Sequence, residues 1–205
     1  MDLPRLVALS PGTLEPDGLE DFKARVRSAV EAGLPGLLLR EGRLDDRHWL
    51  RLFGELRERH PDLWLAGHDR VHLALRVPCQ ALHLGFRSLP PEEVRALAEG
   101  RLVGLSTHDP DDPSSWAGAD YRVHGPVLPT PSKEGLLEPL GADGLARTRT
   151  LDDGRPVLAI GGLCPEDVGL ALGAGAHGVC VLSGLLPRPD PAERTRAYLA
   201  ALEVA

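Results

Sequence analysis

The segment from Pro129 to Gly135, "PTPSKEG", combines groups that bind anions. It holds one of only two lysines in the 205-residue chain, and that lysine stands beside Thr130 and Ser132. An ammonium with three donors and two nearby hydroxyls suits a tetrahedral phosphate. The alternative is a solvated surface loop in which the lysine has no function. We favour the first interpretation and predict a phosphate site that includes Thr130, Ser132 and Lys133.

Two glycine-containing turns favour the same interpretation. Gly161 and Gly162 end the apolar run 156–162, and Ser183 and Gly184 end the run 178–184. Glycine lets the backbone approach a ligand closely, and a helix that follows the turn adds N–H groups and its dipole. The alternative role is a plain turn from strand to helix. We expect both turns and the lysine loop to converge on one phosphate.

The elements that would position these groups are eight short apolar runs, which alternate with charged helical segments. The runs are 6–10, 36–41, 63–68, 81–85, 102–106, 121–127, 156–162 and 178–184. Eight such units predict parallel βαβ repeats that close into an α/β TIM (β/α)8 barrel, one compact domain over residues 1–205. The weakest unit is 107–120, where two prolines leave room for about one helical turn. The rival fold is a doubly wound sheet, but its glycine fingerprint is missing after the first run.

In a TIM barrel the functional residues lie at the C-terminal ends of the strands. Four residues at these ends are expected to bind substrate, and they are Arg40, Asp69, Arg87 and Ser106. Arg40 would hold a carboxylate through two parallel hydrogen bonds. His68 also reaches the mouth and is a candidate for catalysis, whereas His83 lies within a strand and is expected to be a satisfied interior histidine.

Composition excludes several functional classes. The net charge is −7 and no basic run is present, which argues against nucleic-acid binding. No window approaches the roughly 18–20 apolar residues of a membrane span. Three cysteines show neither metal-ligand spacing nor a disulfide framework. We therefore expect a cytoplasmic protein that takes a small-molecule ligand and needs no cofactor, with a homodimer left open.

Six motifs in a fixed order resemble the thiamine phosphate synthase and thiazole tautomerase (TenI) superfamily. They are "LLLRE", "HDRVHLAL", "ALHLG", "VGLSTH", "ADYRVHGPVLPTPSKEG" and "VLAIGGLCPEDVGLALGAGAHGVCVLSGL". The resemblance extends from about Leu6 to Leu202. It implies a TIM barrel that binds a thiazole phosphate through Thr130, Ser132, Gly162 and Ser183, with Lys133 beside them.

The synthases of this superfamily join a hydroxymethylpyrimidine diphosphate to the thiazole phosphate and release pyrophosphate. Their pattern is Q-x-R-E-K at the second strand, N-D after the third and G-Q-E-D after the fourth. In the present chain the corresponding segments read "LLREG", "HD" and "GFRS". Asp69 would hold Mg²⁺ if a synthase site survives, but Arg87 and Ser88 replace the acidic partner, and Mg²⁺ prefers carboxylates.

The tautomerase branch relocates a proton on a thiazole carboxylate phosphate, for which histidine is a suitable acid–base group. Members similar to this branch carry that histidine where the present chain has Pro126. Since residues i and i+2 of a strand share a face, we predict that His124 faces the barrel interior and replaces it. "GFRSLP" is also similar to this branch. We therefore expect a TenI-like tautomerase, with a synthase or a non-catalytic phosphate-ligand binder as the alternatives.

Overall fold

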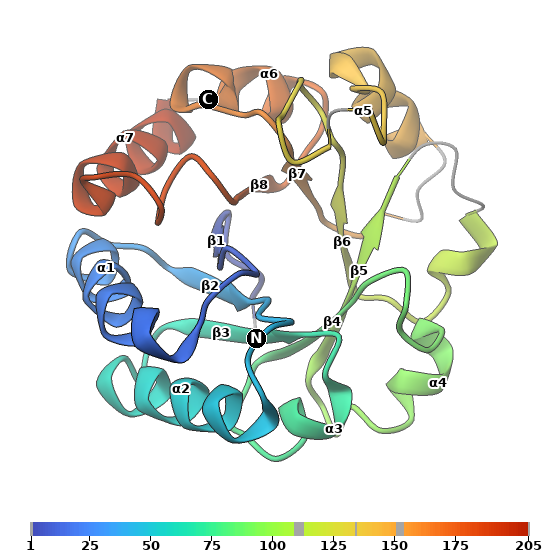
Figure 1. Ribbon diagram of the computed structural model, residues 1–205. Helices are drawn as coiled ribbons and strands as arrows, with labels where there is room; N and C mark the ends of the chain where they lie inside the picture. Colours follow the sequence, from blue (N-terminus) through green and yellow to red (C-terminus); the bar gives the residue numbers. More distant parts are fainter. Residues whose placement is uncertain (1, 109–112, 134, 151–153, 205) are drawn as a thin grey trace.

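The chain folds into a closed barrel of eight parallel strands, with helices around the outside (Figure 1). The computed structural model describes residues 2–108, 113–133, 135–150 and 154–204. The strands pair in sequence order, and β8 closes the barrel against β1. They are β1 (Leu6–Leu9), β2 (Gly36–Leu39), β3 (Trp64–His68), β4 (Ala81–Leu84), β5 (Leu102–Thr107), β6 (Tyr121–His124), β7 (Val157–Ile160) and β8 (Gly178–Val181). The predicted TIM barrel is confirmed.

The connections between strands vary widely in helical content. The α-helices are α1 (Leu19–Glu31), α2 (Asp46–Arg59), α3 (Val71–Ala74), α4 (Pro91–Arg95), α5 (Gly141–Thr150), α6 (Val168–Gly173) and α7 (Pro191–Val204). Short 3-10 helices are η1 (Pro16–Gly18), η2 (Pro113–Trp116) and η3 (Pro165–Asp167). The connection from β5 to β6 contains η2, in agreement with the single turn expected for this weakest unit. Among the described residues, no helix is long and apolar enough to cross a membrane.

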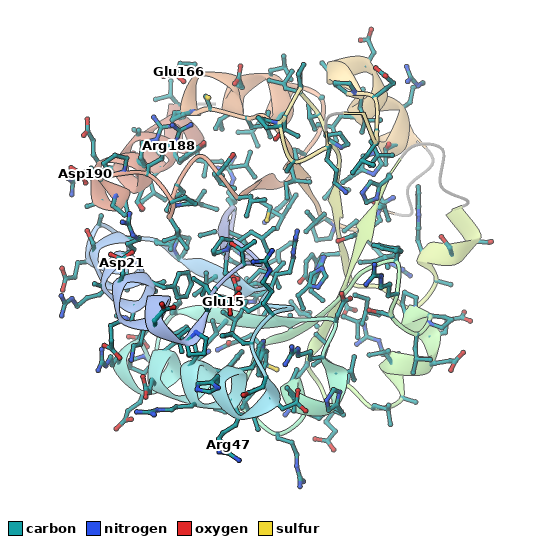
Figure 2. The ribbon with its side chains drawn as sticks, viewed as in Figure 1. Glu15, Asp21, Arg47, Glu166, Arg188 and Asp190 are labelled. Carbon is teal, nitrogen blue, oxygen red and sulfur yellow. The ribbon has the colours of Figure 1, made fainter. Side chains whose placement is uncertain are left out.

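Side-chain alternation along the strands builds two apolar layers. One set of strand residues packs inside the barrel, as Val7, Leu38 and Tyr121 do. The neighbouring set packs outward into the layer between strands and helices, which contains Leu37 of β2 and Trp49 of α2. Both faces are buried, which is why the strands read as continuous apolar runs. Charged side chains such as Asp21, Arg47 and Asp190 point outward from the helical ring (Figure 2).

The barrel interior depends on pairing small residues with large ones. Tyr121 of β6 is 1% exposed and lies across from Gly104 of β5. A Cβ atom at position 104 would lie 2.1 Å from the Cζ atom of Tyr121. Glycine is therefore required at this position, because the tyrosine ring already fills the space that any side chain would need.

We expect Gly104→Ala to lower the free energy of unfolding by about 1–3 kcal/mol, the usual range for overpacking a filled core. Gly54→Ala is the control, since a Cβ at that position in α2 meets nothing within 4 Å. This second change should stabilise the protein by about 0.5–1 kcal/mol, because alanine is the better helix former. Urea unfolding measures both values, and equal stabilities of the two variants would contradict this account of the core.

Candidate active site

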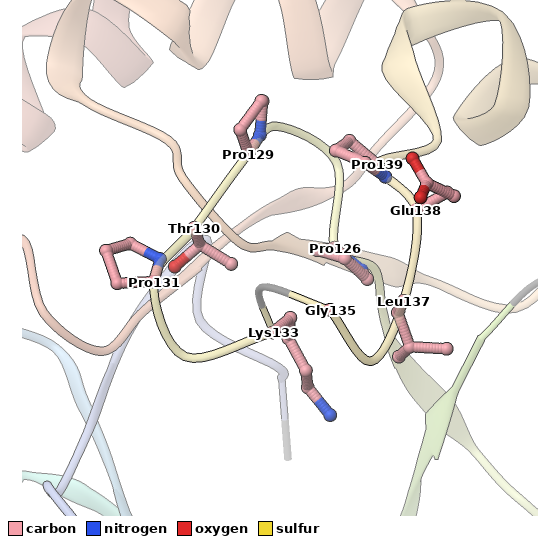
Figure 3. A pocket seen from close by; sticks show the side chains of 9 residues that line it. All are labelled: Pro126, Pro129, Thr130, Pro131, Lys133, Gly135, Leu137, Glu138 and Pro139. Atoms are coloured by element: carbon pink, nitrogen blue, oxygen red, sulfur yellow. The ribbon is translucent and has the colours of Figure 1, made fainter.

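The β6–α5 loop curls around a cavity of about 490 Å³ at the rim of the barrel (Figure 3). The residues that line this cavity all belong to the loop, and they are Pro126, Pro129, Thr130, Pro131, Lys133, Gly135, Leu137, Glu138 and Pro139. The hydroxyls of Thr130 and Ser132 lie 3.3 Å apart, and the Lys133 N–H donates to the Thr130 carbonyl at 3.0 Å. These bonds bring the three predicted phosphate ligands of the loop into one turn.

Positive charge collects where Lys133 meets the ends of β2 and β5. Its Nζ atom lies 3.3 Å from Nε2 of His108, which directly follows β5. Burial, and then the positive charge of Arg40, lowers the pKa of the Lys133 ammonium. Such an arrangement is unfavourable unless an anion occupies it, so it favours phosphate binding. His108 is not among the residues predicted from the sequence to form the site, although its place directly after a strand was an available signal.

Arg40 places its charge over the mouth of the barrel. It follows β2 directly, and its backbone N–H donates to the Ser10 hydroxyl at 2.7 Å. Its charge acts on Lys133 and also on the interior Cys180 of β8, where it opposes the burial that raises the thiol pKa to about 12. Its guanidinium lies against the β1–α1 loop, where a Cβ at Gly12 would come within 3.1 Å of the Nη2 atom. The proposed contact with a substrate carboxylate stays a prediction.

The glycines after β7 let that turn pack directly against the lysine loop. Gly161 and Gly162 have φ angles of +100° and +70°, a region that favours glycine. A Cβ at Gly161 would lie 2.7 Å from Cα of Pro126, and one at Gly162 would lie 2.5 Å from the Pro129 carbonyl oxygen. The Leu128 N–H donates to the Gly161 carbonyl at 3.0 Å. The geometry thus explains both glycines by close packing, and direct phosphate contact stays a prediction.

The turn after β8 is held by arginines of the following segment. Arg188 donates to the Ser183 carbonyl at 3.1 Å, and Arg194 of α7 donates to the Gly184 carbonyl at 3.0 Å. A Cβ at Gly184 would lie 2.5 Å from the Tyr198 hydroxyl oxygen, so a side chain there would disturb α7. Ser183 is exposed and lines no part of the loop cavity. Its role as a phosphate ligand stays a prediction.

His68 and Asp69 form a bonded pair at the end of β3. Nδ1 of His68 lies 3.0 Å from Oδ2 of Asp69, while Oδ1 accepts hydrogen bonds from the Gly85 N–H at 2.8 Å and the Ser88 hydroxyl at 2.6 Å. Burial opposes ionisation of Asp69, but the hydrogen bonds from His68, Ser88 and Gly85 prevail and lower the pKa of this carboxyl. The structure therefore joins two predicted residues, His68 and Asp69, with Gly85 and Ser88, which the sequence had not singled out as ligands.

His83 lies inside the barrel, as predicted for a satisfied interior histidine. Its ring nitrogens lie 3.1 Å from the Tyr121 hydroxyl and 3.0 Å from the Ser106 hydroxyl. It is 1% exposed, and burial lowers its pKa well below the ordinary value, so the imidazole is neutral. Its ring centroid lies 5.3 Å from that of His68. Ser106 thus faces the interior beneath the mouth, where its hydroxyl is already bonded to a neutral ring.

The prediction that His124 faces the barrel interior is wrong. Its Nδ1 atom lies 2.8 Å from the Thr107 hydroxyl, and its Nε2 atom lies 2.9 Å from the Thr148 hydroxyl of α5. Tyr121 and Val123 fill the interior, so alternation directs His124 outward, into the layer between barrel and helix. The strand ends at His124, and the i, i+2 relation therefore does not extend to Pro126.

Arg87 and Phe86 lie on the surface of the β4–α4 connection. The Arg87 guanidinium lies 5.1 Å from the centroid of the Phe86 ring, and that ring is 88% exposed. The cation–π contact holds the charge on the loop rather than in a cavity. Substrate binding by Arg87 stays a prediction.

Comparison with known proteins assigns the chain to a family. Residues 9–185 match the family model described as thiamine monophosphate synthase. A protein of Geobacter sulfurreducens is 40% identical over 191 residues, which cover 90% of this chain and 89% of the relative. The thiamine-phosphate synthase of Thioalkalivibrio sulfidiphilus is 36% identical, with 97% of this chain and 95% of the relative covered.

Comparison with solved structures supports the same family. The structure of thiamine phosphate pyrophosphorylase from Pyrococcus furiosus superposes with a TM-score of 0.83 at 25% identity, over 98% of this chain and 96% of that one. The expected tautomerase activity is contradicted, because the Thioalkalivibrio relative is named a thiamine-phosphate synthase, and neither this name nor that of the Pyrococcus structure points to an isomerase. The similarity to the tautomerase branch at "GFRSLP" rested on one exposed loop, whereas the match to synthases extends over almost the whole barrel. The chain therefore belongs to the thiamine monophosphate synthase family.

Proposed function

We propose that the protein is a thiamine-phosphate synthase, which joins a hydroxymethylpyrimidine diphosphate to a thiazole phosphate and releases pyrophosphate. The observation that carries this proposal is the cationic mouth of the barrel. Lys133 lies beside His108 there, and the positive charge of Arg40 acts on it. Two phosphorylated substrates bring several negative charges to one site, and side chains of this kind neutralise them. The similarity to relatives with this name supports the same conclusion.

The thiazole phosphate fits the lysine loop. Thr130 and Ser132 offer hydroxyls, and Lys133 offers an ammonium, all from one turn beside the cavity of the β6–α5 loop. The Gly161–Gly162 turn closes directly against this loop and fixes its position at the rim. Binding the phosphate at the rim leaves the thiazole ring free to point toward the barrel axis, where His68 and Ser106 lie.

The second substrate reacts at its methylene carbon. A new bond forms between this carbon and the thiazole, while the carbon–oxygen bond to the diphosphate breaks and its electron pair leaves with pyrophosphate. Cations beside the leaving group stabilise the charge that develops on it, and they act more strongly in a site that is partly closed to water. Arg40 and Lys133 supply such charge, and His108 lies beside the Lys133 ammonium.

A cytoplasmic location belongs to this proposal. Cys79, Cys164 and Cys180 are all free thiols, and two of them are buried. Free cysteines are usual in reducing compartments, where disulfides are rare.

Lys133→Ala should raise the KM for the thiazole phosphate about tenfold or more, since a hydrogen bond to a charged group contributes about 1.5–3 kcal/mol. Lys23→Ala is the matched control, because the other lysine of the chain bridges Glu20 and Glu55 between α1 and α2. The control should lose stability and keep its KM. Steady-state formation of thiamine phosphate by both variants measures the difference, and an unchanged KM in Lys133→Ala contradicts the assigned loop.

His124→Gln and His68→Gln separate a structural histidine from a histidine of the site. The first should lower the free energy of unfolding by about 1–3 kcal/mol, because buried threonine hydroxyls lose a partner, while kcat stays within about threefold. The second should lower kcat/KM with little loss of stability, because His68 lies at the mouth. Denaturant unfolding and synthase assays on the same samples test both. A large fall in kcat for His124→Gln alone would reverse the assignment.

A further inference from the structure

The carboxylates at the ends of β2 and β3 are already engaged by the protein itself. Glu41 is 2% exposed, and its two carboxylate oxygens accept hydrogen bonds from the Gly12 N–H at 2.8 Å and the Leu14 N–H at 2.9 Å. It thus fastens the β1–α1 loop to the end of β2. Since both oxygens are bonded and buried, Glu41 is a poor ligand for a metal at the mouth.

Asp69 is engaged by hydrogen bonds too, although its side chain is 41% exposed, unlike that of Glu41. Its two oxygens together receive hydrogen bonds from Gly85 and Ser88 and contact His68. Its backbone adopts a φ of +61°, which few residues other than glycine accept. A Cβ at Gly85 would lie 2.8 Å from Oδ1, so the carboxylate presses directly against the backbone at the end of β4. Asp69 therefore fastens the end of β3 to the β4–α4 loop.

Mg²⁺, the ion that the synthase pattern implies, does not fit this donor set. Mg²⁺ is usually held by one or two carboxylates together with substrate phosphates and water. In the present chain Ser88 stands where the synthase pattern has a carboxylate, and its hydroxyl donates a hydrogen bond to Asp69. Arg87 adds positive charge to the same loop. Within the described ranges, no three histidine, cysteine or acidic side chains gather as a metal site.

We propose that this enzyme binds the diphosphate group mainly through its own cations and that Mg²⁺ contributes little to this binding. Arg40 and Lys133 supply the charge, His108 lies beside the Lys133 ammonium, and Asp69 acts as a clamp between two strand ends instead of a metal ligand. The inference rests on the proposed function, because the diphosphate belongs to the second substrate of the synthase reaction.

The test is calorimetric titration of the whole protein with inorganic pyrophosphate, in saturating Mg²⁺ and in EDTA. Ser88→Asp is the diagnostic variant, and comparing it with the wild-type protein at equal Mg²⁺ removes the effect of Mg²⁺ on pyrophosphate in solution. The new carboxylate would stand at the position from which Ser88 now contacts Asp69 at 2.6 Å. Two carboxylates this close repel each other unless a cation lies between them, so the variant should become dependent on Mg²⁺.

In the wild-type protein we expect the Kd of pyrophosphate to change by less than about threefold between the two conditions, whereas in Ser88→Asp EDTA should weaken binding about tenfold or more. Asp69→Asn should lower the Tm and leave the wild-type insensitivity to Mg²⁺ intact. If this variant does not fold, Ser88→Ala serves in its place, since it removes one hydrogen bond to Asp69 without adding charge.

Two results would overturn the inference. One is a tenfold or greater tightening of wild-type binding by Mg²⁺ that disappears in Asp69→Asn, which would make Asp69 a metal ligand. The other is the absence of pyrophosphate binding in both conditions. Failure of the proposed function has a different signature: pyrophosphate binds without Mg²⁺, as inferred here, but the same sample forms no thiamine phosphate from the two substrates.

Discussion

The closed ladder of hydrogen bonds from β1 around to β8 is the constraint on which the rest of the molecule depends. Because every strand is parallel, all of the strand ends that precede the helices meet at one rim. Residues far apart in the sequence, such as Arg40 and Lys133, thereby act on one another. Closure also buries both faces of each strand, so each polar side chain on a strand needs a partner on its own side.

Those partners differ between the two sides of the barrel. On the inside, His83 is bonded to Tyr121 and Ser106 and remains neutral. On the outside, His124 bonds to Thr107 and Thr148 and links β6 to α5. The two histidines are similar in burial, yet only the first lies below the mouth, next to the ring of His68. The two histidines therefore differ in the side of the barrel that they face.

At the mouth of the barrel, the acidic residues and the basic residues have different roles. Glu41 and Asp69 bind backbone N–H groups and hold the loops in place, and both therefore shape the site without offering a free carboxylate. The positive charge of Arg40 acts on Lys133, and burial makes the charge on Lys133 costly without an anion. Loops fixed by carboxylates and a cavity edged by cations are a combination suited to phosphorylated substrates.

The sequence by itself determined the barrel, because eight apolar runs with helical segments between them leave few other parallel arrangements. It also determined the lysine loop and the place of His83 within a strand, since both depend on local order along the chain. Only the tertiary structure decided which way His124 faces, because alternation states which residues share a face but not which face is inside. It likewise decided the partners of Asp69, whose bonds reach residues 16 and 19 positions away. Such contacts follow from the register of β3 against β4, and a pattern within either strand alone does not contain that register.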